Sequence, residues 1–544
     1  MVQEELSLFR ITTGYFFLLW YIIILVAAYS GFFEILFNFR NRPILHTKQQ
    51  ANHQNDPESD DEEIYEGVTI IRPIKGIDPE LISCLESSFC QNYPRSKLQI
   101  LFCVDDPNDP SIPIIQKLIA KYSTVDAQIL TSESYNSQTK TSDDHYGPNP
   151  KVNNLAKGFV HAKYDILWVM DSNVWASSNI LKNSVISLNG NLNMSRKMGQ
   201  SRPVKLVHHV PLALSINNTT RSDDFIGGQD LEITAMTPVP SSESLNSQLV
   251  KRKLSPKSKN SLNVHPGFTY SKFSKKLGAE LDEMFLHTSH SKFYVLLNNL
   301  AVAPCVNGKS NIYRRSDLDQ SVRLIPHKDS PFFKDPKVKQ DAGYYTSLGV
   351  GHAIKFFARY IGEDNMIGIA LWENTQGRTG LTGDVVVQPY SGSENNAVKD
   401  YIQRRVRWLR VRKYMVLLAT LIEPTTESII CGIYGTYAIS TVFFGTWFNK
   451  YWFVMHMLIW MLTDYVQYHT LINHTLDVKN ITYLPNWLNE SIPPKQRNCL
   501  QWGYIWILRE LLALPIWIIA MIGHEIDWRG RPFRIKKDLT AEEM

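Results

Sequence analysis

The sequence feature that most limits what this chain can fold into is an uncharged apolar stretch close to its start. Residues 11–33, ITTGYFFLLWYIIILVAAYSGFF, are long enough to cross a bilayer as one helix. The stretch is too long for a signal peptide, and no clear small-residue cleavage site follows it. Basic residues, among them Arg40 and Arg42, come after it. The positive-inside rule therefore predicts a non-cytosolic N-terminus at residues 1–10 and a cytosolic middle region.

Further apolar stretches lie near the C-terminus, and we expect membrane helices within residues 428–523. The segment 411–427 before them is too short to span, which favours an interfacial or re-entrant helix. Charged residues within the apolar stretches, such as Asp464 and Arg509, are costly in lipid, so we expect them to face protein. A basic tail follows at 524–544.

Between these apolar regions, residues 66–410 have the pattern of a soluble α/β domain, preceded by an acidic polar linker at 34–65. Short β-rich runs alternate with helical segments, which predicts a mostly parallel, doubly wound sheet. Ligands of such sheets bind beyond the carboxyl ends of the strands. The predicted strands are 67–74, 97–106, 127–130 and 164–172, and the predicted helices include 111–122 and 78–93, the latter with Asp78 as its cap.

Three polar segments interrupt this pattern, and we interpret them as surface insertions without a functional role. Two are rich in Ser, Asn, Thr and Lys and offer little to bury, and the third is a loop of mixed composition. The segments are 132–148, 219–263 and 322–340.

The overall composition argues against several classes of protein. The 544 residues have a formal net charge of +5, and the basic residues gather at 404–413 and 529–537, which favours a local patch over a nucleic-acid-binding surface. Six cysteines without short paired spacing argue against a disulfide framework and a zinc site. The basic run RRVRWLRVRKYM begins at residue 404, just before the C-terminal apolar region, where it can bind lipid headgroups or an anionic substrate.

Carboxylates lie at the ends of two of the predicted strands, and two more begin a predicted helix. Carboxylates at a strand edge can hydrogen-bond a nucleotide or hold Mg²⁺ or Mn²⁺ against a diphosphate, because hard cations prefer oxygen ligands. A further carboxylate can accept a proton from an attacking hydroxyl group. Arginines of the basic run can bind a leaving diphosphate through bidentate hydrogen bonds. The acids are Asp105, Asp106, Asp171, Glu363 and Asp364.

A series of motifs covers most of the chain from residue 66 onward. In order they are RPIKGIDPELISCLESSFCQNYP, CVDDPNDP, NPKVNNLAKGFVHAKYDILWVMDSNV, KLVHHVP, VNGKSNIYRR, RYIGED and RRVRW, with DWRGRPFRIKKDLTAEEM at the end. Together they resemble the ceramide glucosyltransferases (glucosylceramide synthases), glycosyltransferase family 21. The polar insertions favour a fungal member.

The resemblance implies a GT-A-type nucleotide-sugar domain that faces the cytosol, in an integral membrane protein of the Golgi or endoplasmic reticulum. It implies inverting transfer of glucose from UDP-glucose to the primary hydroxyl of ceramide, which gives glucosylceramide, the first step of glucosphingolipid synthesis. Mg²⁺ or Mn²⁺ would be the cofactor. UDP-glucose, ceramide and membrane lipids would be the partners, and no nucleic acid is expected.

The family signature is three separated aspartates followed by (Q/R)xxRW. The residues that match it are Asp106, Asp171, Asp364, Arg404, Arg407 and Trp408. The resemblance gives Asp364 the role of proton acceptor, links His208 to activity and places Lys75 on the nucleotide side. Further candidates are Asp105, Glu363 and Cys305.

The second motif departs from a tight D-x-D, because Ser172 and Asn173 follow Asp171. A metal would then have fewer ligands from the protein. In the first motif, the adjacent acids Asp105 and Asp106 leave the choice of ligand open.

Two other functions are compatible with parts of this pattern. A processive polysaccharide synthase also combines spaced aspartates with a (Q/R)xxRW motif near membrane helices, but it makes a polymer. A membrane scaffold with a lipid-binding basic patch would depend neither on UDP-glucose nor on Asp364. The side of the C-terminus is open too, because four spans would place the basic tail outside, whereas a re-entrant segment would return it to the cytosol.

Overall fold

The structure is a computed structural model. It describes residues 8–39, 65–132, 134, 144–190, 202–216, 270–391, 396–476, 484–490, 499–528, 531–536 and 539–544. Most of the expected linker at 34–65, most of the insertion at 132–148 and all of the one at 219–263 lie outside these residues.

An eight-stranded mixed sheet forms the centre of the α/β domain, in the order β3-β2-β1-β4-β7-β6-β8-β5. Strands β1 to β4 are parallel to one another, β6 is parallel to β8, and β7 and β5 are antiparallel to their neighbours. The predicted mostly parallel α/β fold is therefore confirmed. The strands are β1 (Val68–Ile74), β2 (Leu98–Val104), β3 (Asp126–Leu130), β4 (Ile166–Met170), β5 (Trp175–Ala176), β6 (Val204–Ile216), β7 (Ser310–Arg314) and β8 (Arg378–Ser391).

Helices cover both faces of this sheet, which explains why its central strands are apolar on both sides. Ile71 and Leu101 pack in one apolar core, and their chain neighbours Ile70 and Ile100 pack in the other. The helices of the first face are α5 (Pro150–His161), α11 (Arg315–Arg323), α12 (Pro336–Ser347), η5 (His352–Arg359) and α13 (Glu363–Thr375), and those of the second are α3 (Leu81–Phe89), α4 (Ile112–Lys121) and α6 (Ile180–Leu188).

The prediction that 322–340 is a surface insertion is wrong, because the segment contributes to the core. Its apolar side chains Val322, Ile325, Phe333 and Val338 are almost fully buried in the core under α11, α12 and η5. The mixed sequence carries short helical pieces, among them η4 (Ile325–His327). Their spaced apolar residues supply one core face.

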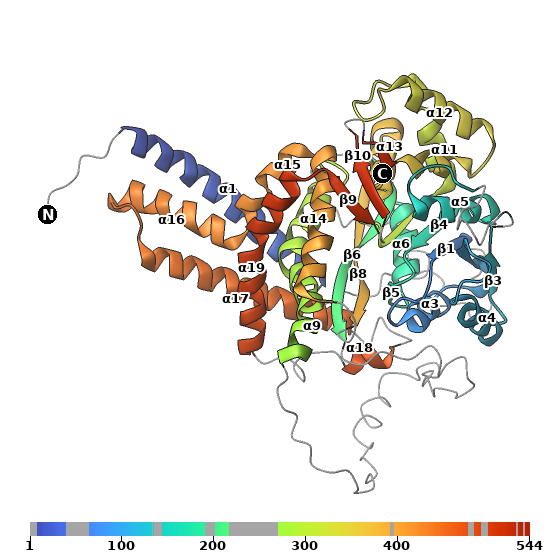
Figure 1. The fold of residues 1–544 in the computed structure, drawn as a ribbon, viewed down its shortest axis with the longest axis horizontal. Coiled ribbons are helices and arrows are strands. Elements are labelled where there is room, and N and C mark those ends of the chain that lie inside the picture. Colours follow the sequence, from blue (N-terminus) through green and yellow to red (C-terminus); the bar gives the residue numbers. More distant parts are fainter. Residues whose placement is uncertain are drawn as a thin grey trace, which may run out of the picture.

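Three helices project side by side from the rest of the chain: α1 (Leu8–Phe39), α16 (Ser428–Phe444) and α17 (Lys450–Thr475) (Figure 1). Small residues allow them to approach closely. A Cβ atom on Gly435 would lie 2.3 Å from the ring of Tyr21, and one on Gly14 would lie 2.9 Å from Thr441.

A second layer joins these helices to the α/β domain. It contains α9 (Tyr270–Phe285), the π-helical turn η3 (Leu286–His290), α10 (Ser291–Leu300), α14 (Val398–Met415), α15 (Leu417–Ile422), η6 (Glu423–Thr426), α18 (Asn486–Glu490) and α19 (Cys499–Ile522). The tail forms a small antiparallel sheet of β9 (Glu525–Trp528), β10 (Arg531–Ile535) and β11 (Ala541–Glu543).

By length and composition, α1 and α19 could each cross a membrane. Residues 417–426 and α16 pass the same test only together, and the chain bends by 74° between them. This bend agrees with the expected interfacial or re-entrant segment at 411–427.

The charged residues in the apolar stretches face protein, as predicted. Asp464 is fully buried and pairs with Lys292 at 2.5 Å, and Arg509 pairs with Glu427 at 2.7 Å. Both pairs tie different helices together.

Candidate active site

A half-buried lysine lies at the centre of the carboxylates that the sequence singled out. The ammonium of Lys151 lies 2.8 Å from Asp171 and 3.1 Å from Glu363, and it donates a hydrogen bond of 3.0 Å to the carbonyl of Gly308. It is also close enough to Asp364 to lower the pKa of that carboxyl group. The structure thus brings the second and third aspartates of the signature into one cluster.

Lys151 is held in place by the first turn of α5. The carboxamide of Asn149 caps this helix, because its oxygen accepts the backbone N–H of Lys151 at 2.9 Å and that of Val152 at 3.2 Å. Its NH₂ group donates to Glu363 at 2.8 Å and to the carbonyl of Tyr360 at 2.7 Å. One side chain therefore fixes the start of α5 against the start of α13.

Asp171 directly follows β4, at the edge where the parallel strands end. Its carbonyl accepts a hydrogen bond of 2.7 Å from the buried guanidinium of Arg72, and its carboxylate also contacts Lys309 at 3.1 Å. Lys151 and Lys309 hold the pKa of Asp171 at about 2 against the opposing effect of burial. Asp171 is thus a carboxylate that is ionised throughout the physiological range.

The expected metal can be tested against this donor set. Among the residues that the structure describes, no group of three or more His, Cys, Asp or Glu could hold a metal ion. Two ammonium groups do lie against the carboxylate of Asp171, which shows that this position accommodates positive charge. Mg²⁺ binds through one or two carboxylates together with substrate phosphates, so Asp171 fits a site of that kind.

Asp364 lies in the first turn of α13, beside the backbone of Gly308, which has no side chain. Desolvation, and then the neighbouring charge of Glu363, raise the pKa of Asp364 well above the usual range of a carboxyl group. A Cβ atom on Gly308 would lie 3.3 Å from its carboxylate and 3.2 Å from Lys151. Asn365 anchors the loop before β7 by accepting the N–H of Val306 at 3.0 Å. The raised pKa of Asp364, and the absence of a side chain at the neighbouring Gly308, suit a group that exchanges a proton with a substrate.

The first signature motif lies at the end of β2. Asp105 pairs with Lys157 at 2.6 Å, whereas the carboxylate of Asp106 accepts the N–H of Asn108 at 2.8 Å. Asp109 accepts the N–H of Gly76 at 2.8 Å, so it fixes the turn that carries Lys75. Lys75 is exposed at this edge.

The assignment of Asp78 as a helix cap is wrong. Helix α3 begins at Leu81, after Glu80 in the left-handed conformation with φ 54°, and no side chain caps it. The carboxylate of Asp78 instead accepts the hydroxyl of Ser172 at 2.6 Å, directly next to Asp171. Asp78 therefore belongs to the strand edge.

The arginines of the (Q/R)xxRW motif lie on α14. Arg404 donates to the buried carboxylate of Asp282 on α9, at 2.8 Å from its Nε, and stacks over Tyr390. Tyr390 is the last residue but one of β8. Burial raises the pKa of Tyr390, and the charges of Asp282, Arg404, Arg407 and Asp78 are close enough to influence it too. The motif thus lies near the strand edge, with Trp408 packed against the apolar layer beneath.

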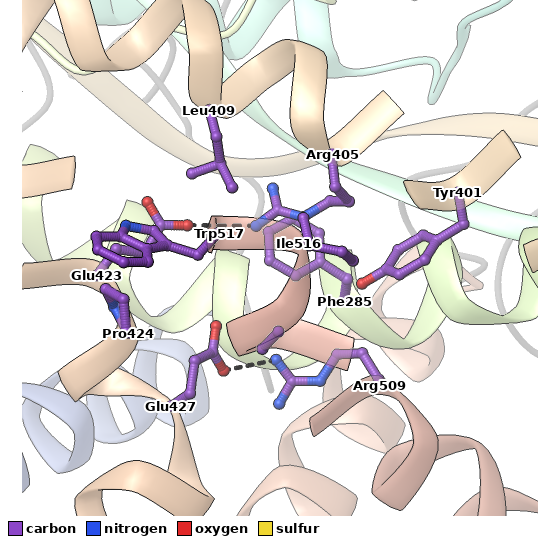
Figure 2. A pocket seen from close by; sticks show the side chains of 11 residues that line it. Phe285, Tyr401, Arg405, Leu409, Glu423, Pro424, Glu427, Arg509, Ile516 and Trp517 are labelled. Carbon is purple, nitrogen blue, oxygen red and sulfur yellow. Dashed lines mark hydrogen bonds and ion pairs between the residues drawn. The ribbon is translucent and has the colours of Figure 1, made fainter. Parts of the chain in front are cut away.

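Arg405 serves a different part of the structure from Arg404. It points into a small cavity beside Glu423, 3.3 Å away, and near the pair of Glu427 and Arg509 (Figure 2). The cavity has a volume of about 20 Å³, enough for one water molecule and too small for a lipid chain. Arg405 therefore joins α14 to η6, close to the start of α16 and to α19.

His208 is buried on β6, away from solvent. Its Nδ1 shares a hydrogen bond with the hydroxyl of Tyr294, and its Nε2 lies 3.1 Å from the oxygen of Asn298. Burial lowers the pKa of His208 to about 3, so the ring is neutral. Asp364 is among the groups that raise the pKa of Tyr294, after burial and Cys305. This arrangement favours a positioning role for His208, through Tyr294.

Cys305 lies in the loop between α10 and β7. Its carbonyl accepts the amide of Asn298 at 3.0 Å, and burial raises the pKa of its thiol. A neutral thiol is a poor nucleophile, so this environment favours a structural role.

Sequence reasoning missed several residues of the cluster. Lys151 and Lys309 stand inside quoted motifs, yet received no role. The Asn-Pro pair before Lys151 is a helix-start signal that could have placed this lysine at the strand edge. Asp282 and Tyr390 carry no such signal, because long-range packing brings them to α14.

Comparison with known proteins identifies the family. The sequence matches the model of glycosyl transferase family 21 over residues 21–218 and 350–541. The chain belongs to glycosyl transferase family 21. A ceramide glucosyltransferase of Candida albicans is 99% identical over the whole of both chains. Those of Komagataella phaffii and Gibberella zeae are 45% and 34% identical, over 97% and 96% of this chain and 91% and 92% of their own. The predicted family and its fungal branch are confirmed.

A solved structure was found at greater distance. A mannosyltransferase from Pyrobaculum calidifontis, in complex with GDP-mannose and Mn²⁺, aligns with 92% of this chain and 97% of its own, at 11% identity. The TM-score of 0.32 is too low to support an argument about function.

Proposed function

We propose that this family 21 glycosyltransferase transfers glucose from UDP-glucose to the primary hydroxyl of ceramide with inversion, giving glucosylceramide. The relatives that match the chain over almost their whole length are named ceramide glucosyltransferases, which supports the acceptor and the sugar. The observation that carries the mechanism is the cluster of Asp364, Lys151 and Asp171 at the carboxyl edge of the sheet.

The donor would bind along this edge. Asp106 and Lys75 would contact the nucleotide, since both lie at the ends of neighbouring parallel strands. Arg404 and Arg407 would bind the diphosphate from α14. A Mg²⁺ or Mn²⁺ ion held by Asp171 would neutralise part of the diphosphate charge.

The acceptor would reach the site from the membrane. Gly362, two residues before Asp364, lies so close to α14 that a Cβ atom there would be 3.0 Å from Val411 and 3.3 Å from Met415. Met415 ends α14, and the exposed apolar side chains of Leu417, Leu418 and Leu421 follow on α15. A lipid hydroxyl at the membrane surface would therefore need little displacement to meet Asp364.

The reaction follows from these positions. The carboxylate of Asp364 would accept the proton of the ceramide hydroxyl while the oxygen attacks the anomeric carbon of the sugar. The bond from that carbon to the diphosphate breaks in the same step, and UDP leaves with its electron pair. One displacement inverts the configuration, so no covalent intermediate with the protein is needed.

The proposed donor and acceptor also imply where the protein lies in the cell. We place the catalytic domain in the cytosol, where UDP-glucose would be available, in an integral membrane protein of the Golgi or endoplasmic reticulum.

The proposal is tested by the product. Membranes containing the full chain are incubated with labelled UDP-glucose and a short-chain ceramide, and the lipids are separated. We expect one β-linked glucosylceramide and no label from UDP-galactose. A labelled polymer would replace the proposal by a polysaccharide synthase, and no labelled product at all would overturn glucosyl transfer.

A further inference from the structure

We propose that α19 does not cross the membrane but lies along the leaflet next to the catalytic domain, with one apolar face in the lipid. Its length of about 36 Å and its hydropathy would allow it to span. Its contacts point to another position.

Along its length, α19 contacts first α17, then the start of α16 and then α15. Near its start, Trp502 packs against Tyr465 and Tyr468 of α17, with ring centroids 5.1 and 6.0 Å apart. In the next turn, the indole of Trp506 donates to Asp464 at 2.8 Å.

Further along, α19 meets the beginning of α16. Arg509 pairs with Glu427, and Glu510 accepts the N–H of Ser428 at 3.1 Å. Trp517 then donates to the carbonyl of Thr420 on α15 at 2.7 Å. In Figure 1, α19 accordingly runs across the bases of α16 and α17, beside α9 and α14.

The opposite ends of the projecting helices lie elsewhere. Arg10, near the start of α1, donates to the carbonyl of Gly445 between α16 and α17, at 3.2 Å. Thr13 and Tyr437 share a hydrogen bond of 2.8 Å close by. The hydrogen bonds, ion pairs and ring contacts between α19 and these helices in the described chain lie in the half of the bundle nearer the α/β domain.

The segments on both sides of α19 contact the catalytic domain. Before it, Trp487 of α18 donates to Ser83 of α3 at 2.7 Å. After it, Leu539 packs against the core that contains α5 and α13. A helix whose two flanks return to the same domain is most simply placed on one side of the membrane.

The C-terminal end of α19 is capped by side chains of α14. Lys413 of α14 donates to the carbonyls of Ala520, Met521 and Gly523 at 3.3, 3.1 and 2.6 Å. Arg410 donates to the carbonyl of Ile519 at 3.2 Å. Cations are favourable at a helix C-terminus, so this end is fixed beside α14.

The face of α19 that is left open is apolar. Its side chains recur along the helix and are between 43% and 85% exposed: Leu500, Tyr504, Ile507, Leu511, Ile518 and Ile522. The opposite face carries the buried Arg509 and Glu510. A helix with one apolar face and charged groups opposite is typical of the membrane interface.

Two features identify the lipid leaflet as the occupant of this face. The exposed Leu417, Leu418 and Leu421 of α15 extend the same kind of surface toward the projecting helices. Beyond the end of α19, exposed residues of both charges follow, among them Glu525, Arg534 and Lys536, and such groups are costly in the hydrocarbon, so this end lies at the level of the headgroups.

Two measurements on the full chain in sealed vesicles test the proposal. The proposal takes α1, α16 and α17 as the crossing helices because they pack side by side, and the deep control on α17 described below checks that α17 crosses. Tags on the N- and C-termini then lie on opposite sides, so a protease outside removes only one of them. If α19 also crossed, both tags would lie on the same side. That result would overturn the proposal, and it needs no substitution in α19.

The second measurement uses depth. Single fluorophores are attached to the open face in the variants Leu500→Cys, Leu511→Cys and Ile522→Cys, in a Cys499→Ser background, and quenched by lipids with nitroxides at known depths. We expect one shallow depth, about 5–10 Å below the headgroups, at all three positions. Leu458→Cys on α17, exposed in the middle of a projecting helix, is the deep control. A depth that changes steadily along α19 would contradict the proposal.

Discussion

Lys151 and Asp171 form an ion pair of 2.8 Å that joins the start of α5 to the end of β4. The pair lies at the point where the separated motifs of the candidate site meet, since Glu363 contacts the same ammonium group at 3.1 Å. Lys151 therefore holds Asp171 and Glu363 together and offsets the repulsion between their negative charges.

Replacing this lysine should therefore damage catalysis more than folding. In Lys151→Gln, Asp171 and Glu363 lose the cation that orients both of them, so we expect kcat/KM for UDP-glucose to fall roughly 10- to 100-fold. Lys337→Gln, at an exposed position of α12, is the matched control. Wild-type kinetics in Lys151→Gln would contradict the role given to the cluster.

The acid limb of the pH–rate profile should report Asp364. A general base works only when ionised, so activity is lost as the pH falls through its pKa. Desolvation and Glu363 raise this pKa and Lys151 lowers it, so the limb should lie above the value of about 3.9 for an ordinary aspartate. Lys151→Gln should move it to higher pH. A limb near pH 4 that Lys151→Gln leaves in place would argue against Asp364 as the titrating group.

Gly308 offers a steric test of the same site. A methyl group there would lie within 3.2–3.3 Å of Lys151 and Asp364, so Gly308→Ala should lower kcat by about tenfold or more by displacing them. Gly343→Ala is the control, because a Cβ atom on Gly343 meets no atom within 4 Å. Equal rates in the two variants would show that the cluster tolerates the change.

The buried pair of Lys292 and Asp464 should matter for stability. Asp464→Leu leaves an unpaired buried ammonium group, which costs about 3–5 kcal/mol. We expect a clearly lower midpoint of thermal unfolding in detergent. The double variant with Lys292→Met should recover most of the loss, and Asp329→Asn, in an exposed pair, should show none. A double variant as unstable as Asp464→Leu would mean that the charge pair is not the cause.

The sequence predicted the α/β sheet well, because its signal is local. The runs that became β1 and β2 are apolar on both faces, and the acids after them mark the edge where parallel strands end. The same local logic failed at Asp78. In the sequence, an aspartate that caps a helix looks the same as one that lies at a strand edge. Only the fold shows that Ser172 lies beside Asp78.

Other parts of the site depend on contacts that no local pattern reveals. Arg404 meets Asp282 across 122 positions of the chain, and Tyr390 reaches them from the end of β8. For α19, a local pattern is present but indicates a different position from the one that its contacts favour. Its hydropathy indicates a span, whereas the carbonyls at its end are capped from α14.

The most direct measurement compares glucosylceramide synthesis by Asp364→Asn and Glu373→Gln in membranes with equal amounts of folded protein. Glu373 is exposed on the same helix, so its variant controls for the loss of a negative charge on α13. If Asp364 is the general base, its variant should be slower by roughly 100- to 10,000-fold while the control keeps the wild-type rate. A rate for Asp364→Asn within about threefold of the control would contradict the account.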